Sequence, residues 1–252
     1  MKIKDKIFRI LFIIFCLYIV SVNWAFSEAT NSSTSVPRVV LAELFVQADC
    51  PTCPQVEFCL EDLVWEYGLE KVILVKEHLW GDGYDTLETN ARYNWYVGEG
   101  KKSTPDVFIN GLTHRIQGLA CEDVDENYDY YKNLIDSELA RTSPLEISAS
   151  KNIFNSTIII EGKIKNINKL PLKNIAVCGM IYKQGEETGL YYWVRDILPL
   201  QNIPLFSFGE SFSFKFVSEP LIQDEDDEEL YHAVIFVQNL ETKEVLQALH
   251  VE

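Results

Sequence analysis

The strongest constraint on the fold is a change of hydrophobic periodicity near residues 141–144. Before this point, segments typical of strands alternate with segments typical of helices. After it, we find almost only strand patterns, separated by short polar turns. The sequence therefore predicts an α/β domain at residues 38–142, followed by an all-β domain at residues 145–252.

The first region contains a regular succession of elements. Strands are predicted at 39–46, 71–79, 103–111 and 113–117, and helices at 54–67, 85–97 and 124–139. Two strands of parallel type joined by a helix, followed by a hairpin and a last helix, predict an α/β arrangement.

The second region contains about seven short strands. They are predicted at 145–150, 157–164, 175–182, 190–197, 211–217, 232–237 and 245–251. In the fifth, Phe212, Phe214 and Phe216 alternate with polar residues, which predicts a strand with one solvated face. Seven strands of this length suggest an immunoglobulin-like sandwich. Because Cys178 is the one cysteine here, packing must replace the cysteine pair usual in such a sandwich.

Residues 1–27 are typical of a secretory signal peptide. A basic start precedes an apolar run from Ile10 to Val22, and Ala25-Phe26-Ser27 offers small residues to signal peptidase. An uncleaved anchor is the alternative, although the run is shorter than the roughly 20 residues that span a membrane. We therefore expect an exported protein, periplasmic or extracellular, that contacts a membrane only if its signal is retained.

The formal net charge of −16 at pH 7 constrains the possible partners. Nucleic acid and anionic membrane surfaces attract basic patches, so neither is an expected partner. A soluble surface that repels its own copies explains the charge sufficiently. The sequence does not indicate an oligomeric state.

Of the six cysteines, Cys16 leaves with the signal peptide, so export places the other five in an oxidising or redox-managed compartment. They are Cys50, Cys53, Cys59, Cys121 and Cys178. Because the number is odd, at least one thiol is free or shared with another molecule. Cys59 follows Cys53 by about 600° around a helix, which favours a buried core thiol over a second exchanging one. Cys121 is either a third exchanging thiol or an inert residue before the last helix, and we favour the inert role.

The stretch ADCPTCP, residues 48–54, places Cys50 and Cys53 three positions apart between a predicted strand and a predicted helix. Unsatisfied N–H groups and the helix dipole at a first turn favour a thiolate. Cys50 is then the attacking thiol, and Cys53 resolves the mixed disulfide. Asp49 should raise the pKa of Cys50 by like-charge repulsion, which favours a reductase or isomerase over a strong oxidant.

Four stretches resemble landmarks of the thioredoxin superfamily in their usual order. They are LAELFVQADCPTCP, KVILVKEHL, STPDVFING and IQGL, and the resemblance covers about residues 38–141. The fold class it implies is a thioredoxin-like α/β domain followed by the immunoglobulin-like sandwich. It also implies that Pro105 is a cis proline facing the dithiol, and that Thr104 and Pro105 hold a bound peptide.

The same resemblance implies that Glu43 is buried and takes a proton from Cys53. Glu43 lies seven residues before Cys50, one more than is usual, so a one-residue longer turn must be assumed. A glutamate at the surface is the alternative. Lys76 stands where relatives place a lysine near that acid, although a solvated strand end is favoured for it.

A metal site is not expected. A closed zinc site needs four ligands, usually as two nearby pairs, and no second C-x-x-C or H-x3-H occurs. His78 could approach the dithiol but is more typical of a polar strand end, and His114, His232 and His250 form no visible cluster. The acidic run at 224–229 lacks the spacing of a calcium loop.

The sequence thus favours an exported thiol-disulfide oxidoreductase of the reductase or isomerase type. Cys50 and Cys53 would exchange disulfides with protein substrates, without an organic cofactor, and a redox partner protein would reset them. The alternative is a non-catalytic secreted binding protein, in which Cys50–Cys53 is a permanent staple and the sandwich makes the contacts.

Overall fold

A computed structural model describes residues 35–121, 126–184, 191–221 and 230–252 of the chain. The predicted signal peptide and the acidic run at 224–229 lie outside these described residues.

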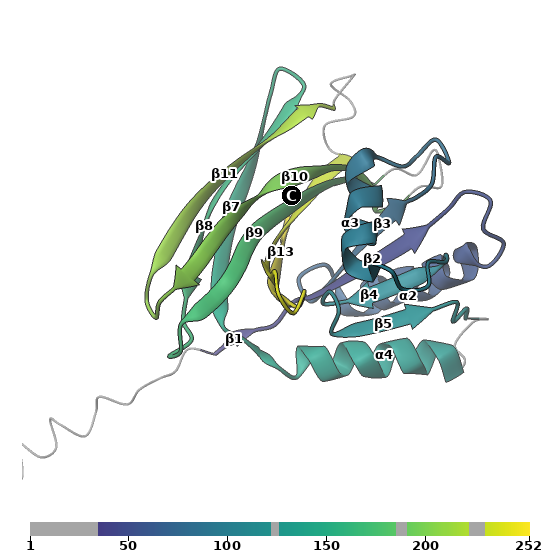
Figure 1. Cartoon of the computed structure of the whole chain (residues 1–252), viewed down its shortest axis with the longest axis horizontal. Helices are drawn as coiled ribbons and strands as arrows, with labels where there is room; N and C mark the ends of the chain where they lie inside the picture. Colours follow the sequence, from purple (N-terminus) through teal and green to yellow (C-terminus); the bar gives the residue numbers. More distant parts are fainter. Residues whose placement is uncertain (1–34, 122–125, 185–190, 222–229) are drawn as a thin grey trace, which may run out of the picture. The chain divides into compact units, whose positions relative to one another are not determined.

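The N-terminal half contains the predicted elements in the predicted order (Figure 1). They are β2 (Val40–Val46), α2 (Cys53–Tyr67), β3 (Val72–His78), α3 (Leu87–Val97), β4 (Asp106–Ile109), β5 (His114–Gln117) and α4 (Glu126–Leu139). Helix α2 ends at Gly68, whose φ of 81° suits a residue without a Cβ. Helix α3 begins with a capping box, in which Thr86 and Thr89 each accept from the other's backbone N–H.

The C-terminal half contains the seven strands that the sequence predicts. They are β7 (Leu145–Phe154), β8 (Thr157–Asn166), β9 (Leu172–Lys183), β10 (Trp193–Phe206), β11 (Ser211–Pro220), β12 (Tyr231–Asn239) and β13 (Val245–Val251). Strands β11, β8 and β7 form one layer, which faces β9, β10, β12 and β13 across an apolar core (Figure 1). In β11, Phe214 and Phe216 are buried while Ser213 and Lys215 are exposed, which confirms the predicted alternation.

The expected fold class, a thioredoxin-like α/β domain followed by a separate all-β sandwich, is wrong. The structure has one eight-stranded sheet in the order β13-β12-β9-β10-β3-β2-β4-β5, so strands of both halves belong to it. The halves join where β10 pairs in parallel with β3, with Trp193 opposite Lys76. At this point the Lys76 N–H of β3 donates to the carbonyl of Tyr192 at 2.7 Å, which links the sheet of the N-terminal half to the sandwich. The bounds 38–142 and 145–252 stay a prediction.

A second junction connects the hairpin β12–β13 to the turn between β4 and β5. Val245 N–H donates to the carbonyl of Asn110 at 3.1 Å, and Leu112 N–H donates to that of Lys243 at 3.3 Å. Gly111 has a φ of 67°, and a Cβ there would lie 2.0 Å from the Lys243 carbonyl oxygen. Glycine is required at this position because the two backbones approach so closely.

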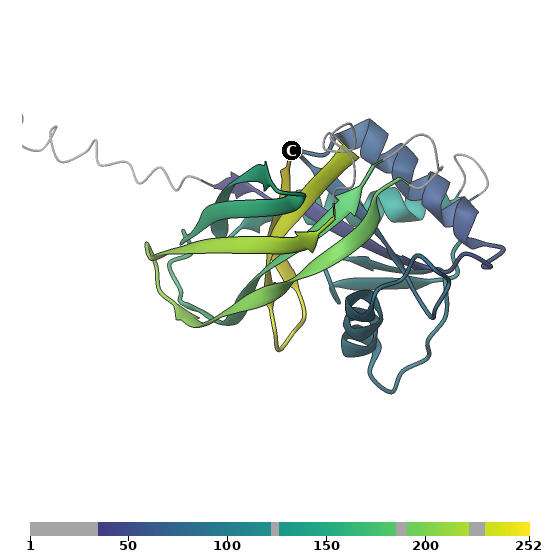
Figure 2. The same cartoon turned by 90° about the horizontal axis from the view of Figure 1, so that it is seen from above.

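Helices α2 and α3 cover opposite faces of the sheet in the N-terminal half (Figure 2). Successive side chains of a strand point to opposite faces, so Lys76 and Glu77 of β3 differ in their surroundings. Lys76 lies under α2, whereas Glu77 lies on the face covered by α3. This alternation decides which buried charges can reach the start of α2.

Candidate functional site

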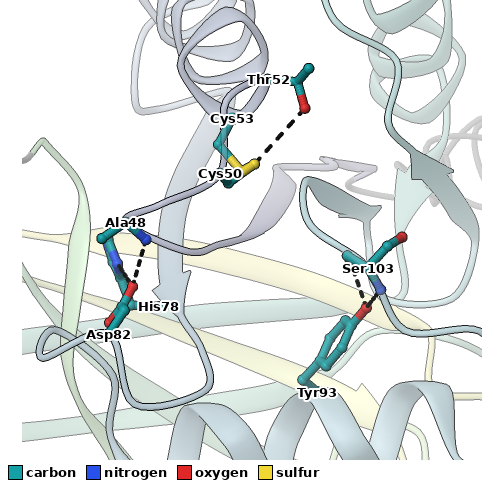
Figure 3. Close-up of a disulfide and its surroundings, with 8 residues drawn as sticks. All are labelled: Ala48, Cys50, Thr52, Cys53, His78, Asp82, Tyr93 and Ser103. Carbon is teal, nitrogen blue, oxygen red and sulfur yellow. Dashed lines mark hydrogen bonds and ion pairs between the residues drawn. A yellow bond between two sulfur atoms is a disulfide. The ribbon is translucent and has the colours of Figure 1, made fainter.

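The two cysteines of the ADCPTCP stretch form a disulfide at the start of α2 (Figure 3). Their Cα atoms are 5.5 Å apart. Cys50 is partly exposed, whereas Cys53 is 1% exposed and belongs to the core beneath the helix. The Cys50 N–H donates to the carbonyl of Gln47 at 3.0 Å and closes a turn after β2. One sulfur of the pair is therefore accessible to another molecule and the other is covered.

The first turn of α2 leaves its electropositive end free. Thr52 is the N-cap residue, but its side chain makes no capping hydrogen bond within the described part of the chain. The first turn is formed by uncharged residues from Cys53 to Val56. Instead, the Thr52 hydroxyl lies 3.9 Å from the Cys50 sulfur (Figure 3). Free N–H groups and a nearby hydroxyl are the environment that stabilises a thiolate.

Asp82 fixes the loop that leads to Cys50. Its Oδ2 accepts from the Ala48 N–H at 2.9 Å and lies 2.7 Å from Nδ1 of His78 (Figure 3). Its Oδ1 accepts from the N–H groups of Tyr84 and Asp85 at 2.9 and 3.1 Å. Burial would raise the pKa of Asp82, but the bonds from His78, Tyr84 and Ala48 lower it overall. One carboxylate thus ties the disulfide loop to the loop after β3.

Tyr93 fixes a second loop, which precedes the Thr104–Pro105 peptide bond. The buried Tyr93 hydroxyl accepts from the Ser103 N–H at 3.0 Å (Figure 3). It also donates to the carboxylate of Asp106 at 2.8 Å. Burial, together with Asp106, raises the pKa of Tyr93 to about 12. The Thr104–Pro105 bond is cis, as the sequence led us to expect. Pro105 is buried and Thr104 is partly exposed. Their role in holding a peptide stays a prediction.

Glu43 is buried, but the structure does not bring it to Cys53. Its carboxylate bonds to the guanidinium of Arg92 and accepts from the Tyr96 hydroxyl at 2.7 Å. Both partners come from α3, on the sheet face opposite to α2. Glu77 lies on the same face, and burial beside Glu43 raises its pKa well above the ordinary value. Glu43 therefore holds Arg92 in the core instead of facing the thiols.

Lys76 lies on the side of the sheet where Glu43 was expected to act. It is 1% exposed, which excludes the solvated strand end that we favoured. Its Nζ lies 2.9 Å from Glu57 and 3.0 Å from Glu61, both on α2. Burial raises the pKa of Glu61, although Lys76 opposes this shift. The carboxylates that pair with the buried Lys76 are thus supplied by α2 itself.

A second disulfide joins Cys59 to Cys121, with 5.9 Å between their Cα atoms. The interpretation of both as separate inert thiols is therefore wrong. Cys59 is 3% and Cys121 is 6% exposed, so this bond is buried in the core. Cys178 is the described cysteine that stays free, and burial raises the pKa of its thiol to about 12. Cys178 is a core residue, as its apolar strand predicts.

Three residues of the site were missed in the sequence. Thr52 stands between the two cysteines, and Asp82 stands between two glycines in a turn, so both residues have a local signal in the sequence. Tyr93 belongs to a helix whose aromatic residues are typical of a core. Its bond to Ser103 depends on tertiary structure and has no local signal.

Comparisons with known proteins identify a structure of the same fold. No family model and no curated protein matches the sequence. HBP35 of Porphyromonas gingivalis is similar with a TM-score of 0.66 and 18% identity, over 86% of this chain and 75% of that chain. A domain of the outer membrane lipoprotein Omp28 from the same organism has a TM-score of 0.33 and 20% identity, over 44% of this chain and 88% of that domain. A Bacteroides uniformis beta-glucuronidase has a TM-score of 0.31 and 20% identity, over 42% and 12% of the two chains.

These findings overturn the expected assignment to the thioredoxin superfamily. The similarity to HBP35 extends through both halves of the chain, and at this identity it shows the fold alone. That fold is mostly β-strand, with three helices among the described residues, and is not an α/β domain of thioredoxin type. The four stretches that suggested the family specify local strand and helix patterns. They do not specify how strands from distant segments pair in a sheet.

The covalent structure agrees with the predicted export. The chain is a disulfide-stabilised protein, and two disulfides in one chain are characteristic of proteins outside the reducing cytosol. Within the described ranges, no helix has the length and apolar character needed to cross a membrane.

Proposed function

We propose that the protein is an exported thiol-disulfide oxidoreductase of the reductase or isomerase type, and that Cys50 and Cys53 are its redox pair. The observation that carries this proposal is the asymmetry of the pair at an uncapped helix start. Cys50 is partly exposed beside the Thr52 hydroxyl, and Cys53 is covered by the helix. A staple needs no such difference, whereas an exchange reaction needs one sulfur to be attacked and one to be protected.

The exchange proceeds through two sulfur transfers. In the reduced protein, the Cys50 thiolate attacks a substrate disulfide, forms a mixed disulfide and releases one substrate thiolate. The Cys53 thiolate then attacks the Cys50 sulfur, which releases the second substrate thiolate and forms the Cys50–Cys53 bond. Two electrons pass from the protein to the substrate, and the released thiolates take up protons. A dithiol partner protein returns the pair to the reduced state by the reverse exchange.

The surroundings of the pair have opposing effects on the Cys50 thiolate, which suits a reductase or isomerase better than a strong oxidant. In the reduced protein, the N–H groups at the start of α2 and the Thr52 hydroxyl would favour the Cys50 thiolate, whereas Asp49, exposed beside it, would oppose this effect. The loop Ser103–Pro105, held by Tyr93, would place its backbone beside a bound peptide. The site requires no organic cofactor, and its natural setting would be the periplasm or the cell exterior.

A redox titration with an internal control tests the proposal. The protein is equilibrated in glutathione or dithiothreitol buffers, its thiols are blocked with an alkylating reagent, and each cysteine peptide is quantified by mass spectrometry. A redox pair at Cys50–Cys53 should titrate between about −120 and −270 mV. Cys59–Cys121, buried in the same chain, should stay oxidised to below about −300 mV.

Trapping of partners provides an independent test. Cys53→Ala should accumulate mixed disulfides through Cys50 in the native compartment, because the resolving thiol is absent. The matched control is Cys50→Ala, which keeps Cys53 but lacks the accessible sulfur. Equal capture by both variants, together with a potential below about −300 mV for both disulfides, would contradict the redox function. The non-catalytic binding protein with a permanent staple would then be the better conclusion.

A further inference from the structure

A second group of polar side chains lies on the C-terminal part of the eight-stranded sheet. It consists of Tyr182 on β9, His232 on β12 and His250 on β13. His232 is directly opposite Tyr182, and His250 is opposite Val234, which is two residues beyond His232. Residues in these registers point to the same face of a sheet. Three strands that follow one another across the sheet thus bring the group together.

The three rings contact one another. The centroids of His232 and His250 are 5.4 Å apart, and Tyr182 lies 5.7 Å from His232 and 6.2 Å from His250. Two imidazoles that bind one ion, each through a nitrogen at about 2 Å, have ring centroids roughly 5 to 6 Å apart. The two histidines are therefore close enough to bind one ion together.

Each member of the group has a buried polar atom without a partner. Nδ1 of His232, Nε2 of His250 and the hydroxyl of Tyr182 are inaccessible to solvent and make no hydrogen bond within the described ranges. Tyr182 itself is fully buried. Leaving a buried polar atom unpaired costs about 1 to 3 kcal/mol. Three such atoms on neighbouring side chains indicate one missing partner that all three share.

We propose that His232, His250 and Tyr182 bind a divalent transition-metal ion. Two imidazole nitrogens favour Zn²⁺, Cu²⁺ or Ni²⁺ over Ca²⁺ and Mg²⁺, which require oxygen ligands. The third protein ligand is a phenol oxygen, and water that enters with the ion completes the coordination. No group of three His, Cys, Asp or Glu side chains that could hold a metal was found in the described parts of the chain, so the site depends on the tyrosine.

This site is independent of the redox pair. Its residues belong to the C-terminal half, and their ring contacts in the described part of the chain do not involve Cys50 or Cys53, although Tyr182 and Cys53 share one apolar core. The sequence does not indicate that His232 and His250 lie close together, because they belong to different predicted strands. The hairpin β12–β13 and its pairing with β9 bring them together.

Calorimetric titration of the full chain with ZnCl2 and NiCl2 tests the site. Both disulfides must be oxidised, so that their sulfurs cannot bind the metal. We expect one ion per chain, and weakening on the order of tenfold or more for His232→Ala and for His250→Ala. Tyr182→Phe should weaken binding less. The control is His114→Ala, which removes a histidine from the other half, and CaCl2 should not bind.

A measurement on the unmodified protein keeps the proposal testable if a variant unfolds. Zn²⁺ should shift the ¹⁵N resonances of the His232 and His250 imidazoles in a histidine-labelled sample, and leave those of His78 and His114 in place. Unchanged affinity in His232→Ala, or zinc-induced shifts at His78 or His114 instead, would overturn the proposal. The three buried atoms would then be paired by water.

Discussion

Each of the two disulfides of this protein includes one cysteine of α2, but the two bonds differ in solvent access and in the length of the loop that they close. Cys50–Cys53 closes the first turn of α2, with a sequence separation of 3 and one partly exposed sulfur. Cys59–Cys121 joins the middle of α2 to the segment before α4, with a sequence separation of 62 and both sulfurs buried. Identical chemistry is thus placed once where another molecule can reach it and once where none can. Under the proposed function, this difference in access and in loop length separates an exchanging disulfide from a structural one.

The largest effect should come from removing the accessible sulfur. Cys50→Ser should lower the rate of disulfide exchange on the order of 10³-fold or more, because the attacking atom is lost. Reduction of insulin in the presence of dithiothreitol measures this rate. The control is Cys59→Ser combined with Cys121→Ser, assayed at a temperature where it stays folded, which should retain the activity. An equal loss in both proteins would abolish the distinction between the two bonds.

The second effect concerns stability and should have the opposite pattern. By chain entropy, replacing Cys59 and Cys121 with serine should cost about 4 kcal/mol in the free energy of unfolding, because this bond closes a long loop. Replacing Cys50 and Cys53 should cost about 2 kcal/mol, since their loop is short. Urea denaturation followed by circular dichroism measures both values. A greater cost for the short loop would show that Cys50–Cys53 is the structural bond.

A smaller effect is expected on the pKa of Cys50, from the hydroxyl of Thr52 at the start of α2. Thr52→Val keeps the shape of the side chain and removes the hydroxyl that lies 3.9 Å from the Cys50 sulfur. Losing a hydrogen bond to a charged group costs about 1.5 kcal/mol, so the pKa of Cys50 should rise by about one unit. Thiolate absorbance against pH measures it. Thr113→Val removes a hydroxyl that bonds to Asn110 elsewhere, and should leave the pKa of Cys50 unchanged.

The smallest effect should come from the loop anchor. Because the pKa of Asp82 is lowered, its charge stabilises the fold above its ordinary pKa and this contribution is lost as the pH falls through the folded value. Asp82→Asn should cost about 1 kcal/mol at pH 7. Below about pH 4 the difference from the unmodified protein should shrink. Urea denaturation at both pH values measures this, with the exposed Asp62→Asn as control. A constant difference would show that the carboxylate charge is not involved.

The elements of this fold could be predicted because their signals are local. The bounds of β2, α2 and β13 follow from apolar runs, the C-x-x-C turn and period-two alternation. The order of the strands in the sheet could not be predicted, because the pairing of Trp193 with Lys76 joins segments that are distant in the sequence. The hydrophobic pattern of residues 71–79 does not indicate that this strand pairs with a strand of the C-terminal half at Lys76.

The site was predicted in part for the same reason. Cys50 and Cys53 are marked by spacing, whereas Cys59 and Cys121 meet only after α2 and the loop before α4 have packed. Glu43 shows how one residue decides a role. Side chains alternate between the two faces of a strand. Glu43, seven residues before Cys50, therefore faces α3, whereas Leu44, six residues before Cys50, faces α2. Glu43 would face α2 and Cys53 only if the longer turn predicted before Cys50 shifted this alternation by one residue.

The pairing of β10 with β3 has a practical consequence for anyone who divides the chain. A fragment that ends near residue 142 would keep both disulfides, yet it would lose the strand that pairs with β3 at Lys76, a buried residue in the intact protein, and would leave that part of the sheet edge open. Bare edges recruit strands from other molecules. Such a truncation would be prone to aggregate, and its failure in an assay would reflect lost solubility instead of lost chemistry.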